Sequence, residues 1–185
     1  MHLGAHAVPA THSGNARTVP APACATAHLG IAARRPTILV LPFDLFDYSL
    51  DRRAATVVPL HRWVAHLAGH ISADLSADAA LNVLAPGSAT AALRTVRAHY
   101  AHPTACQQWV LAVAHRPGAD IAFVGQVRKL SDLIIYFDIP VDDARTGRVL
   151  QVISMRADGA DSNTLWNYIA QNIARRVESA AARAP

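Results

Sequence analysis

Residues 118–150 constrain the fold more than any other part of the chain. They have the pattern of a strand, a kink, a second strand, a turn closed by Gly147 and a third strand. The second strand places apolar residues on one face and mostly polar residues on the other: Ile135, Phe137, Ile139 and Val141 against Tyr136, Asp138 and Asp142. Period-two alternation predicts a sheet with one buried and one partly wet face. We expect antiparallel strands over residues 121–128, 133–141 and 148–155.

The remaining elements follow from shorter patterns. An aliphatic run at residues 37–43 predicts a buried first strand, and residues 81–84 predict another. Apolar residues spaced three and four apart predict helices over residues 54–69, from about residue 88, over residues 104–115, and from Asp161 or Ser162 onward. The fold class is therefore α/β, a mixed sheet of about five strands with a C-terminal antiparallel meander and helices packed on it.

Residues 1–36 differ in composition from the rest. They are rich in proline, histidine and alanine and have neither helical nor strand period, which predicts a disordered leader. They also lack the basic start and continuous apolar run of a convincing signal peptide. A degenerate secretion signal and a misplaced start codon both stay open. We expect one folded domain over residues 37–180.

The net charge of +4 does not indicate a nucleic-acid surface. Residues 1–36 hold three arginines and no acid, whereas residues 37–185 hold 14 basic and 13 acidic side chains, without a basic cluster. No run is long and apolar enough for a membrane span. Cys24 and Cys106 are too few for a disulfide framework or a cysteine zinc site.

Two histidines are candidates for a metal site. His66 and His70 stand four apart on a predicted helix, the spacing used by helical zinc sites. The sequence between them contains no glutamate, so exposed histidines without a metal are the competing interpretation. A metal-dependent protein or hydrolase using this pair and nearby acids is the alternative function.

The segment 44–51 is the predicted partner or ligand site. It follows the carboxyl end of the first strand, where open α/β sheets place ligands, and we expect a loop there. Aromatic residues supply contact area and acids orient a partner. Cation binding, or simple capping of the core by the loop, stays open. The candidate residues are Asp44, Phe46, Asp47, Tyr48 and Asp51.

Ser131 and Lys129 lie at the predicted kink between strands. A Ser-Lys pair can act as a nucleophile and base. A serine at such a position more commonly binds nearby backbone, so we expect a structural role for both residues. The chain has no Gly-x-Ser-x-Gly, no Gly-x-x-x-x-Gly-Lys and no Gly-x-Gly-x-x-Gly, which argues against hydrolase and nucleotide sites, and we expect no cofactor.

Three motifs carry a family resemblance: Leu41-Pro-Phe-Asp-Leu-Phe-Asp-Tyr-Ser-Leu-Asp51, Gly118-Ala-Asp120 with Val124-Gly-Gln-Val-Arg-Lys-Leu-Ser131, and Val141-Asp-Asp-Ala-Arg-Thr-Gly147. Through them the chain resembles a bacterial secreted-protein family known as a domain of unknown function. It also looks like the amino-terminal domain of TolB and CsgG-like periplasmic domains. The resemblance implies a periplasmic or secreted protein. The chain departs from the pattern in residues 1–36 and 158–163.

The leading hypothesis is a non-enzymatic extracytoplasmic binding or assembly module that acts through an unidentified protein partner. It rests on the resemblance and on the lack of a coherent catalytic motif.

Overall fold

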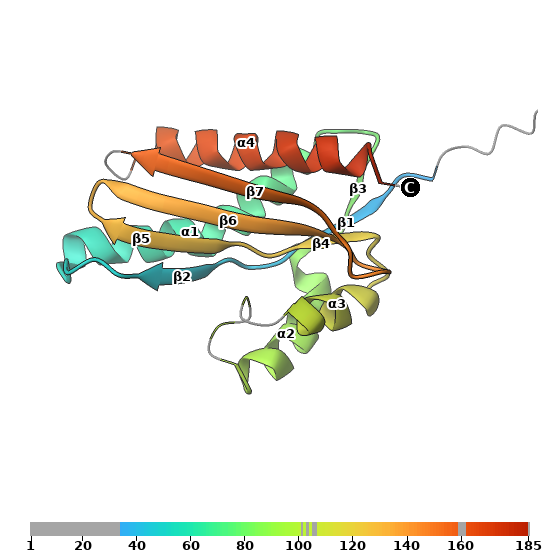
Figure 1. Cartoon of the computed structure of the whole chain (residues 1–185), viewed down its shortest axis with the longest axis horizontal. Coiled ribbons are helices and arrows are strands. Elements are labelled where there is room, and N and C mark those ends of the chain that lie inside the picture. Colours follow the sequence, from blue (N-terminus) through green and yellow to red (C-terminus); the bar gives the residue numbers. More distant parts are fainter. Residues whose placement is uncertain (1–33, 101, 103, 105–106, 159–161, 185) are drawn as a thin grey trace, which may run out of the picture. The chain divides into compact units, whose positions relative to one another are not determined.

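A seven-stranded mixed sheet with helices on both faces makes up the described part of the protein (Figure 1). The computed structural model describes residues 34–100, 102, 104, 107–158 and 162–184. These residues belong to one unit, Arg34–Pro185. Most of the predicted leader thus lies outside the described residues. The elements in chain order are β1 (Thr37–Val40), β2 (Asp44–Asp47), α1 (Ala54–Ser76), β3 (Asn82–Val83), α2 (Thr90–Arg97), α3 (Gln107–His115), β4 (Ile121–Phe123), β5 (Gln126–Ser131), β6 (Ile134–Asp143), β7 (Val149–Asp158) and α4 (Asn163–Ala181), with a 3₁₀ helix at Pro86–Ala89 between β3 and α2.

Strand β6 organises the sheet. It pairs antiparallel with β7 along one side, and with β5 and then β4 along the other. Strands β1 and β2 run parallel to β4 and β5, and β3 runs parallel to β1. The mixed α/β prediction is confirmed, and the sheet is five strand paths wide. One path contains β1 and β2 in succession, and another contains β4 and β5. The sheet therefore has seven strands where the sequence predicted about five.

The antiparallel meander is confirmed with shifted boundaries. The first predicted strand divides into β4 and β5 at Val124 and Gly125, while β6 and β7 extend two and three residues further than expected. The pairing of β5 with β6 changes register between Lys129 and Ser131, at the predicted kink. Gly147 closes the β6–β7 turn with φ of 74°, a backbone conformation that glycine adopts without steric cost.

Helices α1 and α4 pack side by side on one face of the sheet. Trp166 of α4 lies at the centre of this layer: its ring stacks on Trp63 at 6.0 Å and meets the edge of Phe137 at 5.7 Å. The inward-facing residues predicted for β6 belong to this cluster. Of the two predicted caps for α4, Ser162 Oγ accepts a hydrogen bond from the Leu165 amide, while Asp161 lies outside the described residues.

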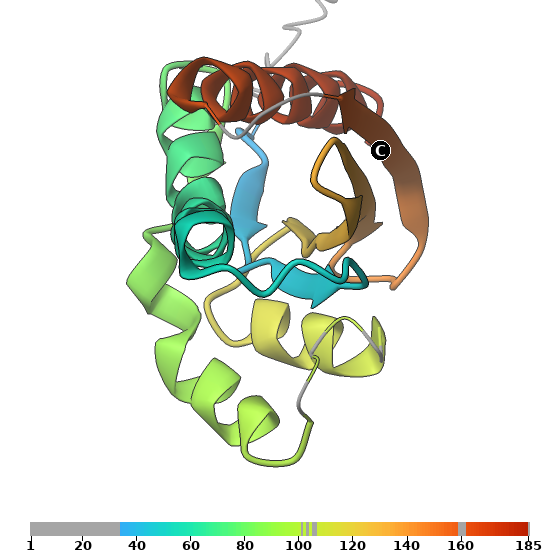
Figure 2. The same ribbon diagram turned by 90° about the vertical axis from the view of Figure 1, so that its left-hand side faces the viewer.

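The other face is covered at one end. There α2 and α3 pack a second apolar cluster onto β1 and β4, through residues such as Leu39, Trp109 and Ala122. Helix α3 also reaches β6 on this face, because Val110 lines a cavity of about 250 Å³ with Asp138 and Pro140. Figures 1 and 2 show no described helix over the part of this face next to the β5–β6 turn. Tyr136 and Asp138, which were predicted for a partly wet face, are half-buried, whereas Asp142, the third residue predicted for that face, is buried.

Two predicted elements differ from the structure. Residues 44–47 form β2 and are not a loop, because they pair with β5 in parallel register from Asp44–Gln126 to Asp47–Lys129. Helix α1 continues past Gly69 to Ser76, because Ile71 and Leu75 extend its buried stripe. None of the helices in the described ranges has the length and hydropathy needed to cross a bilayer.

Candidate functional site

The predicted site residues lie where β2 passes into the connection to α1. Asp44 is buried, and its carboxylate accepts hydrogen bonds from the backbone N–H and hydroxyl of Thr104, at 2.8 and 2.9 Å. The two residues are 60 positions apart in the sequence. Asp44 therefore connects the segment before α3 to β2. Its carboxylate is hydrogen-bonded within the protein and is buried.

The other two acids also bind nearby groups. Asp47 accepts hydrogen bonds from the Ser49 amide and hydroxyl, at 2.9 and 2.6 Å. Asp51 accepts from the backbone N–H, Nε and Nη2 of Arg53, at 2.8 to 2.9 Å. The Arg53 hydrogen bonds hold the pKa of Asp51 well below its usual range. Both carboxylates therefore shape the connection 48–53.

Four large apolar residues near these acids are exposed. Tyr48 is 61%, Leu50 96%, Leu130 47% and Leu133 63% exposed. We refer to these four residues as the apolar end. The Tyr48 amide donates to the Lys129 carbonyl at 2.9 Å, which places Tyr48 beside Leu130. Figure 1 shows the β2–α1 connection and the β5–β6 turn at the same end of the sheet, the end that faces the viewer in Figure 2.

Phe46 continues this surface along the outer face of β2. Its ring lies 4.3 Å from that of His102 and 6.4 Å from that of Tyr48, measured between centroids. The rings of Phe46 and Tyr48 are nearly parallel. The two aromatic residues predicted for the site are therefore brought together, with Phe46 half-buried and Tyr48 exposed.

A chain of ion pairs joins the two segments of the apolar end. Lys129 is 2% exposed, and its Nζ lies 2.9 Å from the Asp132 carboxylate. Arg53 Nη2 lies 3.3 Å from the same carboxylate and 2.8 Å from Asp51. The tip of the β5–β6 hairpin is thereby held against the connection that leads into α1.

Ser131 faces its own turn. Its Oγ accepts a hydrogen bond from the Leu133 amide at 3.3 Å. This contact agrees with the structural role expected for Ser131 and Lys129, which stays a prediction.

The two predicted metal ligands lie on α1. His66 and His70 are both exposed, and the ring of His70 packs 6.3 Å from that of Trp63. Within the described residues no group of three or more histidine, cysteine, aspartate or glutamate side chains could hold a metal ion. A pair of histidines supplies fewer ligands than the three or four protein groups that zinc sites use.

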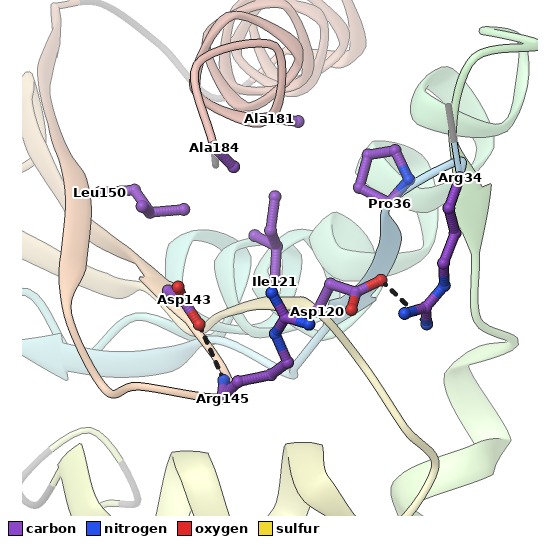
Figure 3. Close-up of a pocket in the computed structure, with 9 residues that line it drawn as sticks. All are labelled: Arg34, Pro36, Asp120, Ile121, Asp143, Arg145, Leu150, Ala181 and Ala184. Carbon is purple, nitrogen blue, oxygen red and sulfur yellow. Dashed lines mark hydrogen bonds and ion pairs between the residues drawn. The ribbon is translucent and has the colours of Figure 1, made fainter. Parts of the chain in front are cut away.

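A cavity lies at the other end of the sheet, by the amino ends of β1 and β4 (Figure 3). Its volume is about 400 Å³, and Ile121, Leu150 and Ala184 form apolar parts of its lining. Figure 3 shows its polar groups binding the chain: Arg34 Nη2 lies 3.3 Å from Asp120, and Asp143 accepts from the Arg145 amide. None of the residues predicted for a site lines this cavity.

The described residues form a mixed α/β domain with exposed apolar side chains in the β2–α1 connection and the β5–β6 turn. The family model DUF3280, described as "Protein of unknown function (DUF2380)", matches residues 36–174, and the chain belongs to this family. This confirms the expected membership of a family of unknown function. No curated protein is significantly similar to the chain in sequence.

Several solved structures are similar in chain arrangement. TolB from Acinetobacter baumannii has a TM-score of 0.48 and 11% identity, over 80% of this chain and 28% of that one. Lipoprotein GNA1162 from Neisseria meningitidis has a TM-score of 0.47 and 15% identity, over 77% and 96%. The C-terminal domain of LpoB from Salmonella enterica has a TM-score of 0.43 and 8% identity, over 68% and 84%. Similarities at this level do not transfer a function.

Proposed function

We propose that the protein is a non-enzymatic binding or assembly module that acts outside the cytoplasm and holds a protein partner at its apolar end. The observation that carries this proposal is the exposure of Tyr48, Leu50, Leu130 and Leu133 in two segments at the same end of the sheet (Figure 1). Contiguous apolar surface on a soluble domain marks interaction sites. The partner-contact hypothesis from the sequence, which assigned contact area to Phe46 and Tyr48 and orientation to the acids, is thus kept and extended to Leu50, Leu130 and Leu133.

The surroundings of the apolar end suit a protein interface. Arg52 and Arg53 are exposed beside it, and the Asp132 carboxylate is about half exposed. Apolar and aromatic groups enclosed by a polar rim are the usual anatomy of such a surface. The ion pairs from Lys129 and Arg53 to Asp132 fix the relative position of Leu50 and Leu133, so that little order has to be imposed when a partner binds.

The proposal that the protein is not an enzyme rests on the contacts and positions of the candidate catalytic side chains. Ser131 Oγ accepts from its own turn, and the Lys129 ammonium is paired with Asp132. His66 and His70 are exposed on a helix, away from the connection 48–53 in sequence. A catalytic set needs a nucleophile, a base and an orienting group within hydrogen-bond reach of one another.

Site-specific photo-crosslinking in the native host tests the partner surface. Benzoylphenylalanine at Leu50 or Leu133 should give one discrete protein adduct. The matched control is Tyr168 on α4, which is 59% exposed and lies outside the apolar end. We expect the adduct formed from position 133 to be lost in Leu50→Ser, with unchanged thermal unfolding. The same adduct from position 168, or none from positions 50 and 133, would contradict the proposal.

The location requires a separate test. The full-length chain fused to alkaline phosphatase, which needs an oxidising compartment for its disulfides, should be active in intact cells. A fusion that is inactive although it is stably produced would place the protein in the cytoplasm and remove this part of the proposal.

A further inference from the structure

We propose that the outer edge of β7 is a second binding site, at which an extended segment of a partner protein adds to the sheet as an antiparallel strand. Strand addition to an exposed edge is a recurring mode of peptide recognition, in which main-chain hydrogen bonds supply affinity and alternate side chains supply specificity. The proposal does not depend on the apolar end.

The edge is long and regular. Strand β7 has 10 residues, and within the described ranges β6 is the strand that pairs with it. Every second residue of such a strand directs its backbone N–H and C=O away from the neighbour it already has. Helix α4 runs beside β7 on the inner side of the sheet (Figure 1), and Arg183 Nη2 donates to the Gln151 side chain at 2.8 Å. Within the described ranges, no strand pairs with the outer edge of β7.

The usual protection of an edge strand is incomplete here. Natural edges carry prolines, bulges, short strands or charges. The sequence of β7 contains no proline, and the register shift against β6 falls at its beginning, between Val141 and Asp142 of β6. Residues 151–158 therefore form a regular ladder with an exposed valine, Val152, and charges towards the far end.

The exposed side chains define the chemistry of the added strand. Over residues 151–158 they are Val152, Ser154, Arg156 and Asp158. Arg156 Nε lies 2.7 Å from the Asp158 carboxylate, and its guanidinium lies 6.0 Å from the Tyr136 ring centre. Cross-strand pairs are favourable when an apolar residue meets valine and when opposite charges meet. An antiparallel partner therefore reads, from its amino end, basic-x-acidic-x-threonine-x-valine.

A second copy of β7 does not meet this requirement. In a symmetric antiparallel pair, placing Val152 opposite its own copy brings Arg156 opposite Arg148 of the other chain. If Arg156 instead faces Asp158 of the second copy, the position opposite Val152 falls after the end of the second β7, so Val152 has no strand residue opposite it. No symmetric register satisfies both positions, so the charges favour a different chain as the occupant.

Two peptides of identical composition test this site on the full-length protein. The first is Lys-Ile-Glu-Thr-Thr-Ile-Val, and the second exchanges its charges to give Glu-Ile-Lys-Thr-Thr-Ile-Val. With a fluorescent label on each, anisotropy should show at least about fivefold tighter binding of the first peptide, the scale of two cross-strand charge pairs. Equal binding of the two peptides, or binding of neither at millimolar protein, would overturn the proposal.

A charge exchange in the protein supplies the matched variant. Arg156→Asp with Asp158→Arg keeps an ion pair on β7, and should reverse the preference between the two peptides. The backbone N–H groups of the peptide alternate between facing β7 and facing away from it. N-methylation of the amides that face β7 should abolish binding, whereas N-methylation of the other amides should not. If neither set weakens binding, or the exchange leaves the preference unchanged, the peptide is not an added strand. Leu50→Ser should bind the first peptide normally, which separates this result from the proposed function.

Discussion

At the scale of single residues, the Asp143 carboxylate stabilises the β6–β7 turn. It accepts hydrogen bonds from the amides of Arg145 and Thr146, at 2.9 and 3.0 Å. Burial alone would raise the pKa of Asp143, but these hydrogen bonds outweigh it and hold the pKa below its ordinary value. A lowered pKa in the folded state means that the charged carboxylate stabilises the fold above about pH 4, and that this contribution is lost as the pH falls further.

Asp143→Ala should therefore lower the free energy of unfolding by about 1–2 kcal/mol at pH 7, the scale of local hydrogen bonds to a charged group. The loss should be smaller at pH 3, where the carboxylate of the parent is largely protonated. Asp143→Asn keeps an acceptor oxygen, so its free energy of unfolding should lie between those of the parent protein and Asp143→Ala. Urea titrations at both pH values measure this, and an equal loss at pH 7 and pH 3 would show that the charge is not used.

Neighbouring residues of β6 give a second residue-scale prediction. Phe137 is fully buried against Trp166, whereas Tyr136 is half-buried on the outer face beneath Arg156. Phe137→Ala should lower the free energy of unfolding by about 3–5 kcal/mol, as buried aromatic truncations do. Tyr136→Ala should cost less, because solvent fills the space it leaves. Urea unfolding that ranked the two variants the other way would contradict the assigned faces of the sheet.

At the scale of elements, the interruptions in the sheet depend on close packing. Gly125 separates β4 from β5, and a Cβ there would overlap the ring of Phe43 and approach Ile139 Cγ1 at 2.9 Å. Phe43 itself lies in the interruption between β1 and β2. The break between β1 and β2 therefore lies beside the break between β4 and β5, and the ring of Phe43 fills the space that a side chain at position 125 would need.

Gly125→Ala should consequently cost about 1–3 kcal/mol or more, since an overpacked core must displace its neighbours. Gly87→Ala is the matched control, because a Cβ at Gly87 meets no atom within 4 Å. Phe43→Leu in the Gly125→Ala background should recover part of the loss, and thermal unfolding of the four variants forms a double-mutant cycle. Additive effects in that cycle would show that the two residues do not compete for space.

The elements were predictable to the extent that their signals are local. The alternation in β6 and the three-four spacing in α1 and α4 fixed the meander and the helices, because both periods follow from backbone geometry. The separation of β2 from β1 was not predictable, because it depends on pairing with β5 about 80 residues away in sequence. The site was predicted less well for the same reason. The sequence does not show that Thr104 binds Asp44, or that the turn at Leu133 leaves its side chain uncovered.

At the scale of the described unit, the helices are distributed unevenly over the sheet. Helices α1 and α4 cover one face, while α2 and α3 cover the β1 and β4 end of the other. The surface that they leave open contains the mixed side chains of β5 to β7, and it adjoins the apolar end and the edge of β7. The two proposed binding sites, the apolar end and the outer edge of β7, thus lie at the borders of this surface.

Among the described residues, the members of the two apolar clusters begin at Ile38. Removing residues 1–33 should therefore leave the melting temperature within about 2 °C, because segments without buried apolar anchors contribute little to stability. Removing residues 1–36 should cost more, about 1 kcal/mol, since the Asn82 amide donates to the Pro36 carbonyl at 3.0 Å and Arg34 pairs with Asp120. Calorimetry of both truncations distinguishes the contributions. A large fall in melting temperature for the shorter deletion would show that residues 1–33 take part in the folded core.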